Sequence, residues 1–296
     1  MYTSVVPQGV LAVLAVAEIV SQTGGLYVLQ TNGSGGRWVY RLSSATVASS
    51  SAAGFQIGPF GFWPTWSADG NRLAFTQSSN LRVVEADGSG LRDVVVGGAA
   101  LPVSDEFAPQ YAKDRWIYFT RGQFGSQRTF WRVREDGSGL AQVSEQRAWG
   151  VESMPSPSPA GDVVAYQTND VTNSPTDFTL RFISPLSGAI RKLDMRGYSP
   201  RWSPAGNRVA YLNGPDRLNL LDANGTPLGQ VGGRPVALQQ GFSWSPDGEW
   251  VVGVGTLDGP VPVLELVNVT SGLVLPLVFR GPEGQPLTQP SWQPAR

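Results

Sequence analysis

The stretch PTWSADGNRLAF at residues 64–75 returns later in the chain as PRWSPAGNRVAY at residues 200–211. Looser copies are PQYAKDRWIYF from 109, PSPSPAGDVVAY from 155 and FSWSPDGEWVV from 242, and the chain ends on PSWQPAR from 290. The position that Trp66 occupies in the first copy therefore recurs every 42–48 residues. A fixed period of this length indicates a repeat architecture.

Each copy has the pattern of a strand, a tight turn and a second strand. The turn residues include Gly, which tolerates the positive φ of such turns. Later in each period comes a second turn of the Asp-Gly or Asn-Gly type, as at Asp87-Gly88, Asp136-Gly137 and Asn224-Gly225. These dipeptides between β-rich runs are a strong hairpin signal. Four antiparallel strands in each period of about 45 residues are the unit of a β-propeller blade.

Six copies predict an all-β fold, a six-bladed β-propeller that forms one domain over residues 1–296. The last copy has no blade of its own, so we expect the C-terminal strand to join the N-terminal blade, which closes the ring and leaves no open edge. In that blade, residues 9–20, 26–30 and 37–42 are predicted as the second, third and fourth strands. The predicted blades are 289–296 with 8–50, then 62–97, 107–145, 153–193, 198–233 and 240–277.

The composition removes several classes of function. With no Cys and no His among 296 residues, the chain has no disulfides, no thiol catalysis and no Ser-His-Asp arrangement. A net charge of −1 argues against nucleic-acid binding. Asp69, Asp87, Asp136 and Asp247 fall at separate turns, so we expect no metal site and no cofactor, and Asp69 and Asp247 should cap their own turns. No apolar run is long enough to span a membrane.

The repeat resembles the TolB-type (WD40-like) propeller repeat, with its Pro-x-Trp-Ser-Pro-Asp-Gly core. The residues that carry the resemblance are Pro64, Trp66, Ser67, Asp69 and Gly70, then Pro200, Trp202, Ser203, Pro204 and Gly206, then Trp244, Ser245, Pro246, Asp247 and Gly248. The resemblance extends through all six copies, but TolB also has an N-terminal α/β domain that this sequence has no room for. It implies an extracytoplasmic protein of the bacterial envelope, and we expect its export signal to lie outside this chain.

Propellers bind ligands where the loops that enter the innermost strands converge at the channel mouth. Just inside those loops, each copy has one equivalent position, which is occupied in turn by Thr65, Gln110, Ser156, Arg201, Ser243 and Ser291. The aromatic and polar side chains at the mouth can hold a peptide or a sugar, or the channel can simply be filled with water. The candidate binding residues are Trp63, Glu106, Gln110, Glu152, Tyr198, Arg201, Gln240 and Gln289.

Three kinds of function are compatible with this sequence. The first, which we favour, is a non-catalytic monomeric scaffold for a protein or peptide partner. The second is a carbohydrate-binding or carbohydrate-active propeller in which Glu106 and Glu152 serve as the acid and base. The third is the propeller domain of a prolyl-oligopeptidase-like peptidase, whose catalytic Gly-x-Ser-x-Gly motif and His are missing from this chain.

Overall fold

A computed structural model shows the architecture of the chain. It describes residues 26–31, 36–42, 53–59, 61–77, 79–95, 105–122, 128–144, 151–169, 178–214, 217–231, 241–255, 263–277 and 287–292. Nearly all of these residues lie in or between antiparallel strands, and one short 3₁₀ turn, η1 (Lys113–Arg115), interrupts them. Within these ranges, no helix has the length and apolar character needed to cross a membrane.

The strands fall into antiparallel units of four, which we number along the chain. The first unit is β24 (Leu287–Trp292), β1 (Leu26–Thr31), β2 (Gly36–Leu42) and β3 (Ala53–Pro59). The second is β4 (Gly61–Trp66), β5 (Arg72–Gln77), β6 (Asn80–Glu85) and β7 (Arg92–Val95). The third is β8 (Asp105–Tyr111), β9 (Trp116–Gly122), β10 (Arg128–Arg134) and β11 (Ala141–Gln142).

The remaining units continue the same order. The fourth is β12 (Val151–Pro157), β13 (Val164–Asn169), β14 (Thr179–Ile183) and β15 (Ile190–Arg196). The fifth is β16 (Tyr198–Trp202), β17 (Arg208–Asn213), β18 (Arg217–Asp222) and β19 (Pro227–Gln230). The sixth is β20 (Ser243–Trp244), β21 (Trp250–Gly255), β22 (Val263–Asn268) and β23 (Val274–Leu277). One parallel pair, Arg128 with Val151, joins the third unit to the fourth.

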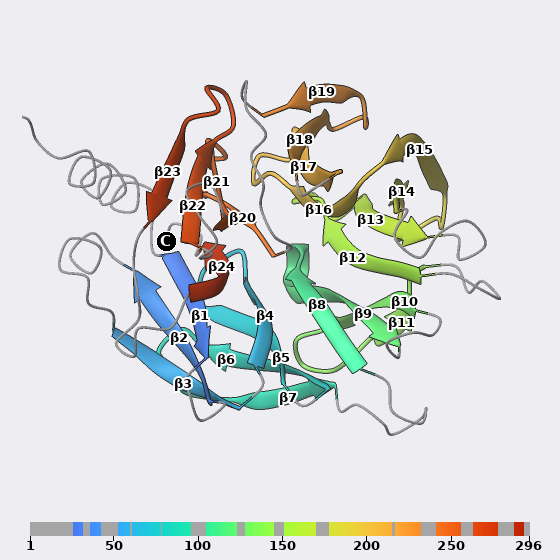
Figure 1. The fold of residues 1–296 in the computed structure, drawn as a ribbon. Helices are drawn as coiled ribbons and strands as arrows, with labels where there is room; N and C mark the ends of the chain where they lie inside the picture. Colours follow the sequence, from blue (N-terminus) through green and yellow to red (C-terminus); the bar gives the residue numbers. More distant parts are fainter. Residues whose placement is uncertain are drawn as a thin grey trace, which may run out of the picture.

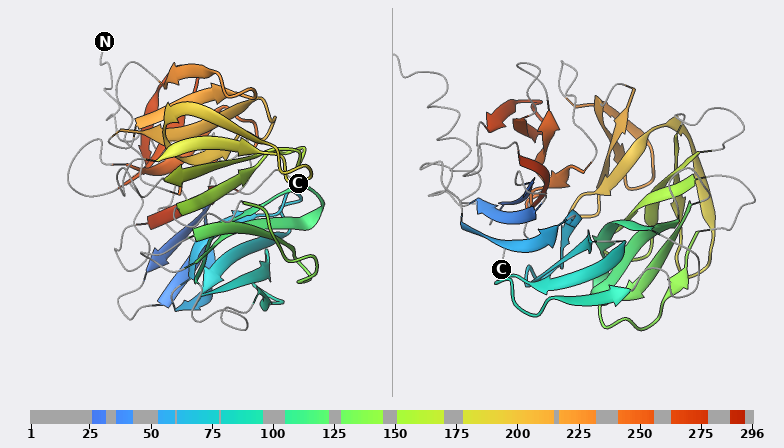
Figure 2. Two further views of the ribbon diagram at one scale, coloured as in Figure 1. Left: turned by 90° about the vertical axis from the view of Figure 1, so that its right-hand side faces the viewer. Right: turned by 60° about the horizontal axis from the view of Figure 1, so that its bottom comes forward.

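The units stand around a common centre. In Figure 1 the first strand of each unit lies innermost, and the outermost positions belong to strands such as β3, β7, β15, β19 and β23. The innermost strands contact one another around the centre, as β24 does with β4, β4 with β8 and β12 with β16. The views in Figure 2 show neighbouring units stacked side by side around the same centre. The protein is an all-β propeller.

The first unit contains strands from both ends of the described chain. β24 pairs with β1 in antiparallel register, Leu26 opposite Trp292 and Tyr27 opposite Ser291. This pairing is the contact that the closure hypothesis requires.

The assignment of strands within the first unit was wrong by one position. Residues 26–31 and 36–42 form its second and third strands, and Ala53–Pro59 forms the fourth. The stretch 9–20, which the sequence analysis had assigned as the second strand, lies outside the described residues. The strand at 53–59 was missed because Gly54 and Gly58 weaken the β-signal of the alternating Phe55 and Ile57.

Apolar side chains fill the spaces between units. Trp202 packs in one cluster with Leu180 and Phe182 of the fourth unit and with Val209 and Tyr211 of its own. Trp244 is buried in the same way between the fifth and sixth units. Trp202 and Trp244, which occupy the same position of their copies, thus both pack between neighbouring units.

The Ser-x-Asp-Gly turns are closed by their own side chains. Ser67 Oγ donates to Asp69 Oδ1 at 2.6 Å and accepts the Arg72 backbone N–H at 3.0 Å. The Asn71 N–H donates to the same Asp69 oxygen, and the Glu249 N–H donates to Asp247 in the equivalent turn. Asp69 and Asp247 thus cap their turns as expected, and the Ser67 hydrogen bond lowers the pKa of Asp69.

Candidate binding site in the central channel

A cavity of about 460 Å³ lies at the centre of the ring, and we call it the channel cavity. Its walls come from all six innermost strands and from the turns that follow them, such as those at Ala68, Lys113, Asp114, Pro159 and Pro204. At the other end, where the chain enters these strands, the walls are formed by Trp63, Pro64 and Gly241. The cavity thus extends toward the turns that leave the innermost strands, whereas the sequence analysis placed the mouth at the loops that enter them. A volume of this size is typical of sites for small molecules or short peptide segments.

One residue of each innermost strand forms a ring around this cavity. The members of this channel ring are Thr65, Gln110, Ser156, Arg201, Ser243 and Ser291, and all of them line the cavity. Three hydroxyls in alternate positions of the ring also join neighbouring units. Each of these hydroxyl oxygens accepts a hydrogen bond from a backbone N–H of the next innermost strand. The pairs are Thr65 with Tyr111 at 3.4 Å, Ser156 with Trp202 at 3.0 Å, and Ser243 with Trp292 at 3.1 Å.

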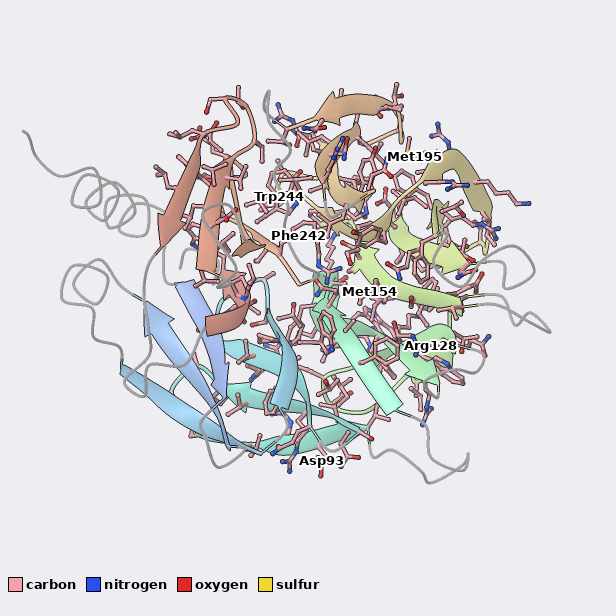
Figure 3. All side chains as sticks on the ribbon, viewed as in Figure 1. Asp93, Arg128, Met154, Met195, Phe242 and Trp244 are labelled. Atoms are coloured by element: carbon pink, nitrogen blue, oxygen red, sulfur yellow. The ribbon has the colours of Figure 1, made fainter. Side chains whose placement is uncertain are left out.

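A repeated backbone irregularity positions the channel ring. Two residues before each of five ring members, the chain has a positive φ: Trp63 (58°), Ala108 (51°), Met154 (53°), Ser199 (50°) and Gly241 (95°). In four of these strands the register shifts at this point. Positive φ costs a non-glycine residue about 1–3 kcal/mol. The bulge turns the following side chain away from the sheet and toward the centre. Met154 and Phe242, labelled in Figure 3, lie near that centre, whereas Asp93 and Arg128 lie at the periphery.

Hydrogen bonds from the preceding unit stabilise this bulge. The Met154 N–H donates to Thr120 Oγ1 at 3.1 Å, and the Ser199 N–H donates to Gln167 Oε1 at 2.7 Å. Both bonds are buried. Thr120 and Gln167 occupy the second strands β9 and β13 of their units. The third and fourth units each supply an acceptor for the displaced N–H of the next unit, which couples the shape of the channel to the packing of these units.

Removing one of these acceptors is expected to destabilise the whole protein. Thr120→Val keeps the shape of the side chain but leaves the buried Met154 N–H without its acceptor, which should lower the free energy of unfolding by about 1–3 kcal/mol. Denaturant unfolding measures the difference. Thr120→Ser keeps the hydroxyl and is the control, so a valine variant as stable as the serine variant would contradict this role of Thr120.

Arg201 is the most unusual member of the channel ring. Its residue surface is only 6% exposed, and Nη1 donates to the Pro200 carbonyl oxygen at 2.9 Å. The indole Nε1–H of Trp244 donates a hydrogen bond to the backbone carbonyl oxygen of Arg201 at 3.0 Å. No carboxylate among the described residues pairs with this guanidinium. Burial alone lowers the pKa of Arg201 to about 10, so it remains charged at neutral pH.

The carboxylate of Glu135, which is a hydrogen-bond partner of the cavity residue Tyr111, is paired with two arginines. Glu135 forms ion pairs with Arg72, and with Arg115 at 3.2 Å. It also accepts a hydrogen bond from the Tyr111 hydroxyl at 3.4 Å, and Tyr111 itself lines the cavity. Burial and the Glu135 charge raise the pKa of Tyr111. This cluster joins the second and third units and pairs the Glu135 carboxylate with two guanidinium groups.

The structure places the eight candidate residues in different environments. Trp63, Gln110 and Arg201 line the channel cavity, whereas Glu152 and Tyr198 are not among its lining residues. The Tyr198 hydroxyl donates to the Gly214 carbonyl oxygen at 3.2 Å. The side chains of Glu106 and Gln289, on β8 and β24, lie outside the described side chains, and all of Gln240 lies outside the described residues.

Glu152 is buried and does not line the channel cavity. It is 2% exposed and stands opposite Thr168 on the next strand. Gly197 occupies the equivalent position of the fifth unit, two residues before the positive φ of Ser199, and a Cβ there would meet Tyr211 and Leu180 at 2.6–3.1 Å. These contacts come from the same unit (Tyr211) and from the neighbouring one (Leu180), and the Glu152 side chain is not among those that line the cavity.

Several residues of the cavity are not among the binding candidates predicted from the sequence. Ser156, Ser243 and Ser291 are identified from the sequence as lying just inside the loops but are not candidates, and neither are Trp202, Trp244 and Trp292. All six line the cavity. The alignment of the copies already contained this signal, because the residue before each Trp position is the channel ring residue.

No family model matches this chain. An uncharacterized protein of Agrobacterium fabrum is 31% identical to it over 165 residues, which covers 51% of this chain and 54% of the relative. The chain thus spans about half the length of the curated relative that it matches.

Solved structures resemble the whole propeller. TolB from Acinetobacter baumannii has a TM-score of 0.70 at 12% identity, over 93% of this chain and 68% of that one. A chain of the nidogen–laminin complex has a TM-score of 0.63 at 12% identity, over 90% and 97% of the two chains. An oligogalacturonate lyase in complex with manganese has a TM-score of 0.51 at 14% identity, over 81% and 75%. At these identities the likeness concerns the fold, and the chain has a TolB-like β-propeller fold.

Proposed function

We propose that this chain is a non-catalytic scaffold that binds a peptide segment of a protein partner in the channel cavity, outside the bacterial cytoplasm. The observation that carries the proposal is the cavity of about 460 Å³ lined by residues of all six innermost strands. Aromatic walls such as Trp63 and Trp202 offer apolar contact, and the channel ring offers hydrogen-bonding groups. A rigid site of this kind lowers the entropy cost of binding.

The fold likenesses agree with this proposal without deciding it. One similar structure is TolB and another comes from a complex of two proteins, nidogen and laminin. The likeness to oligogalacturonate lyase keeps a carbohydrate-active propeller as the second candidate. Against that candidate, Glu152, half of the acid–base pair that the sequence suggested, is 2% exposed and does not line the cavity.

Quantitative affinity purification from a bacterial envelope extract tests the scaffold. Trp63→Ala with Gln110→Ala removes an aromatic wall and an amide that line the cavity, so we expect a partner captured by the parent protein to be lost. The control is Leu186→Ala, an 85% exposed side chain on the turn after β14. If the double variant folds and captures the same partners as the control, the binding surface lies elsewhere.

A glycan panel tests the second candidate. We expect no hydrolase or lyase activity from the parent chain. Activity that disappears in Glu152→Gln, with the melting temperature unchanged, would overturn the non-catalytic assignment.

A further inference from the structure

The channel cavity contains a buried positive charge that has no counter-charge among the residues that the structure describes. Three charged residues line the cavity: Arg201 in the channel ring, and Lys113 and Asp114 together on one turn. Lys113 and Asp114 are exposed at that turn, whereas Arg201 is buried. Since Lys113 and Asp114 offset each other, the net charge of the lining is that of Arg201. A buried charge without a partner is costly, and a ligand with the opposite charge would offset that cost.

The other members of the channel ring supply donors and no negative charge. The guanidinium of Arg201 has five N–H donors, and among the described residues it makes one hydrogen bond, to Pro200. Next to it in the ring, the Ser156 hydroxyl accepts the Trp202 N–H, which leaves its own proton available. Gln110 donates one amide hydrogen to the Pro109 carbonyl oxygen, so its second amide hydrogen can bind a ligand. A site in which several hydrogen-bond donors surround one cation is suited to binding an oxyanion.

We propose that the channel cavity binds a carboxylate group of a peptide, anchored by the guanidinium of Arg201 and assisted by the donors of the channel ring. This rests on the proposed function, because it names the chemical group through which the partner peptide is held. A planar guanidinium matches the two oxygens of a carboxylate in a bidentate pair. The position of Arg201 suits this role, because the Trp244 indole fixes its backbone and the bulge at Ser199 directs it to the centre.

A matched pair of small probes tests the charge directly. N-acetyl-glutamate amide and N-acetyl-glutamine amide differ only by carboxylate against carboxamide, and ligand-observed NMR or calorimetry at low salt measures their binding to the full chain. We expect saturable binding of the glutamate probe and at least about tenfold weaker binding of the glutamine probe. N-acetyl-glutamine with a free α-carboxylate then shows whether a C-terminal carboxylate is accepted as well. Equal binding of the two amides, or none by either, would overturn the proposal.

Two substitutions of Arg201 separate ligand binding from a structural role. Arg201→Met removes the charge at similar length and should abolish binding of the glutamate probe. Because it removes a desolvated, unpaired charge, it should leave the melting temperature equal or raise it. A structural arginine would give the opposite result, a lower melting temperature. Arg201→Lys keeps the positive charge but lacks the planar guanidinium. This variant should bind the probe more weakly than the parent protein but more tightly than Arg201→Met does. Full probe affinity in Arg201→Met would contradict the proposal.

The outcome is independent of the partner experiment. If Trp63→Ala with Gln110→Ala loses the partner but the glutamate probe does not bind, the scaffold stands and the carboxylate anchor is wrong. If the probe binds through Arg201 but the partner is retained by that double variant, the anion site stands and the scaffold surface is wrong.

Discussion

Trp202→Ala is expected to lower the free energy of unfolding by about 3–5 kcal/mol, the usual cost of truncating a large buried aromatic side chain. Trp202 is 9% exposed and lies in a cluster contributed by the fourth and fifth units. Its ring centroid is 5.5 Å from that of Phe182 in the neighbouring unit. The alanine variant leaves a cavity between the two units, and the strands cannot collapse into it without disturbing the ring. Denaturant unfolding measures the loss.

Two comparisons make this result specific. Trp202→Phe retains much of the contact with Phe182 and should lose less stability than the alanine variant. Leu186→Ala, at an 85% exposed position, should stay within about 0.5 kcal/mol of the parent. Trp202 also lines the channel cavity, so it could instead serve as a platform for the ligand. In that case the alanine variant would keep its stability and lose only binding.

The repeat predicted the fold because the same residue types build it in several units. Trp202 and Trp244 fill equivalent spaces between units, and the Ser-x-Asp-Gly turns at Ser67 and Ser245 close in the same way. Each of these features depends on side-chain type at a fixed spacing, which a sequence records directly. The first unit was assigned less well, since its strand at 53–59 carries no copy of the motif and two glycines.

The candidate site was harder to predict because its geometry depends on the backbone. Trp63, Ala108, Met154 and Ser199 adopt a positive φ, and nothing in these residue types indicates it. Gly241 alone, at the same position of the sixth unit, suggests such a conformation. The bulge changes which side chains face the centre. It places the channel ring on the cavity and leaves Glu152 buried away from the cavity, and simple alternation along the strand does not predict this.

The hydrogen bonds between units could not be predicted from the sequence either. The acceptors Thr120 and Gln167 are different residue types that serve the same purpose for Met154 and Ser199. A comparison of copies by residue type does not match a hydroxyl with an amide. Their common role follows only from the displaced backbone N–H that each one satisfies, and that N–H is visible only in the folded chain.

Deletion of residues 289–296 is expected to have the largest effect of all, the loss of a stably folded ring. The deletion removes the C-terminal part of β24, including Ser291 and Trp292, which pair with Tyr27 and Leu26 of β1. It also removes Trp292, which is 4% exposed and whose N–H donates to Ser243 Oγ of the sixth unit. Since β24 lies between β1 and the neighbouring innermost strands, its loss would leave an unpaired edge on β1 and an open wall at the channel cavity.

Thermal unfolding and light scattering measure this effect. We expect the truncated chain to aggregate, or to melt far below the parent, because an exposed edge strand recruits other chains. A synthetic peptide of residues 287–296, added in excess, supplies the missing strand and should restore part of the melting temperature, since a ligand that binds only the folded state stabilises it by mass action. A peptide with Trp292 replaced by Ala is the matched control and should restore less. Closure by this strand would be refuted by a truncated chain that melts cooperatively at the parent temperature, because the ring would then hold together without the contact between β24 and β1.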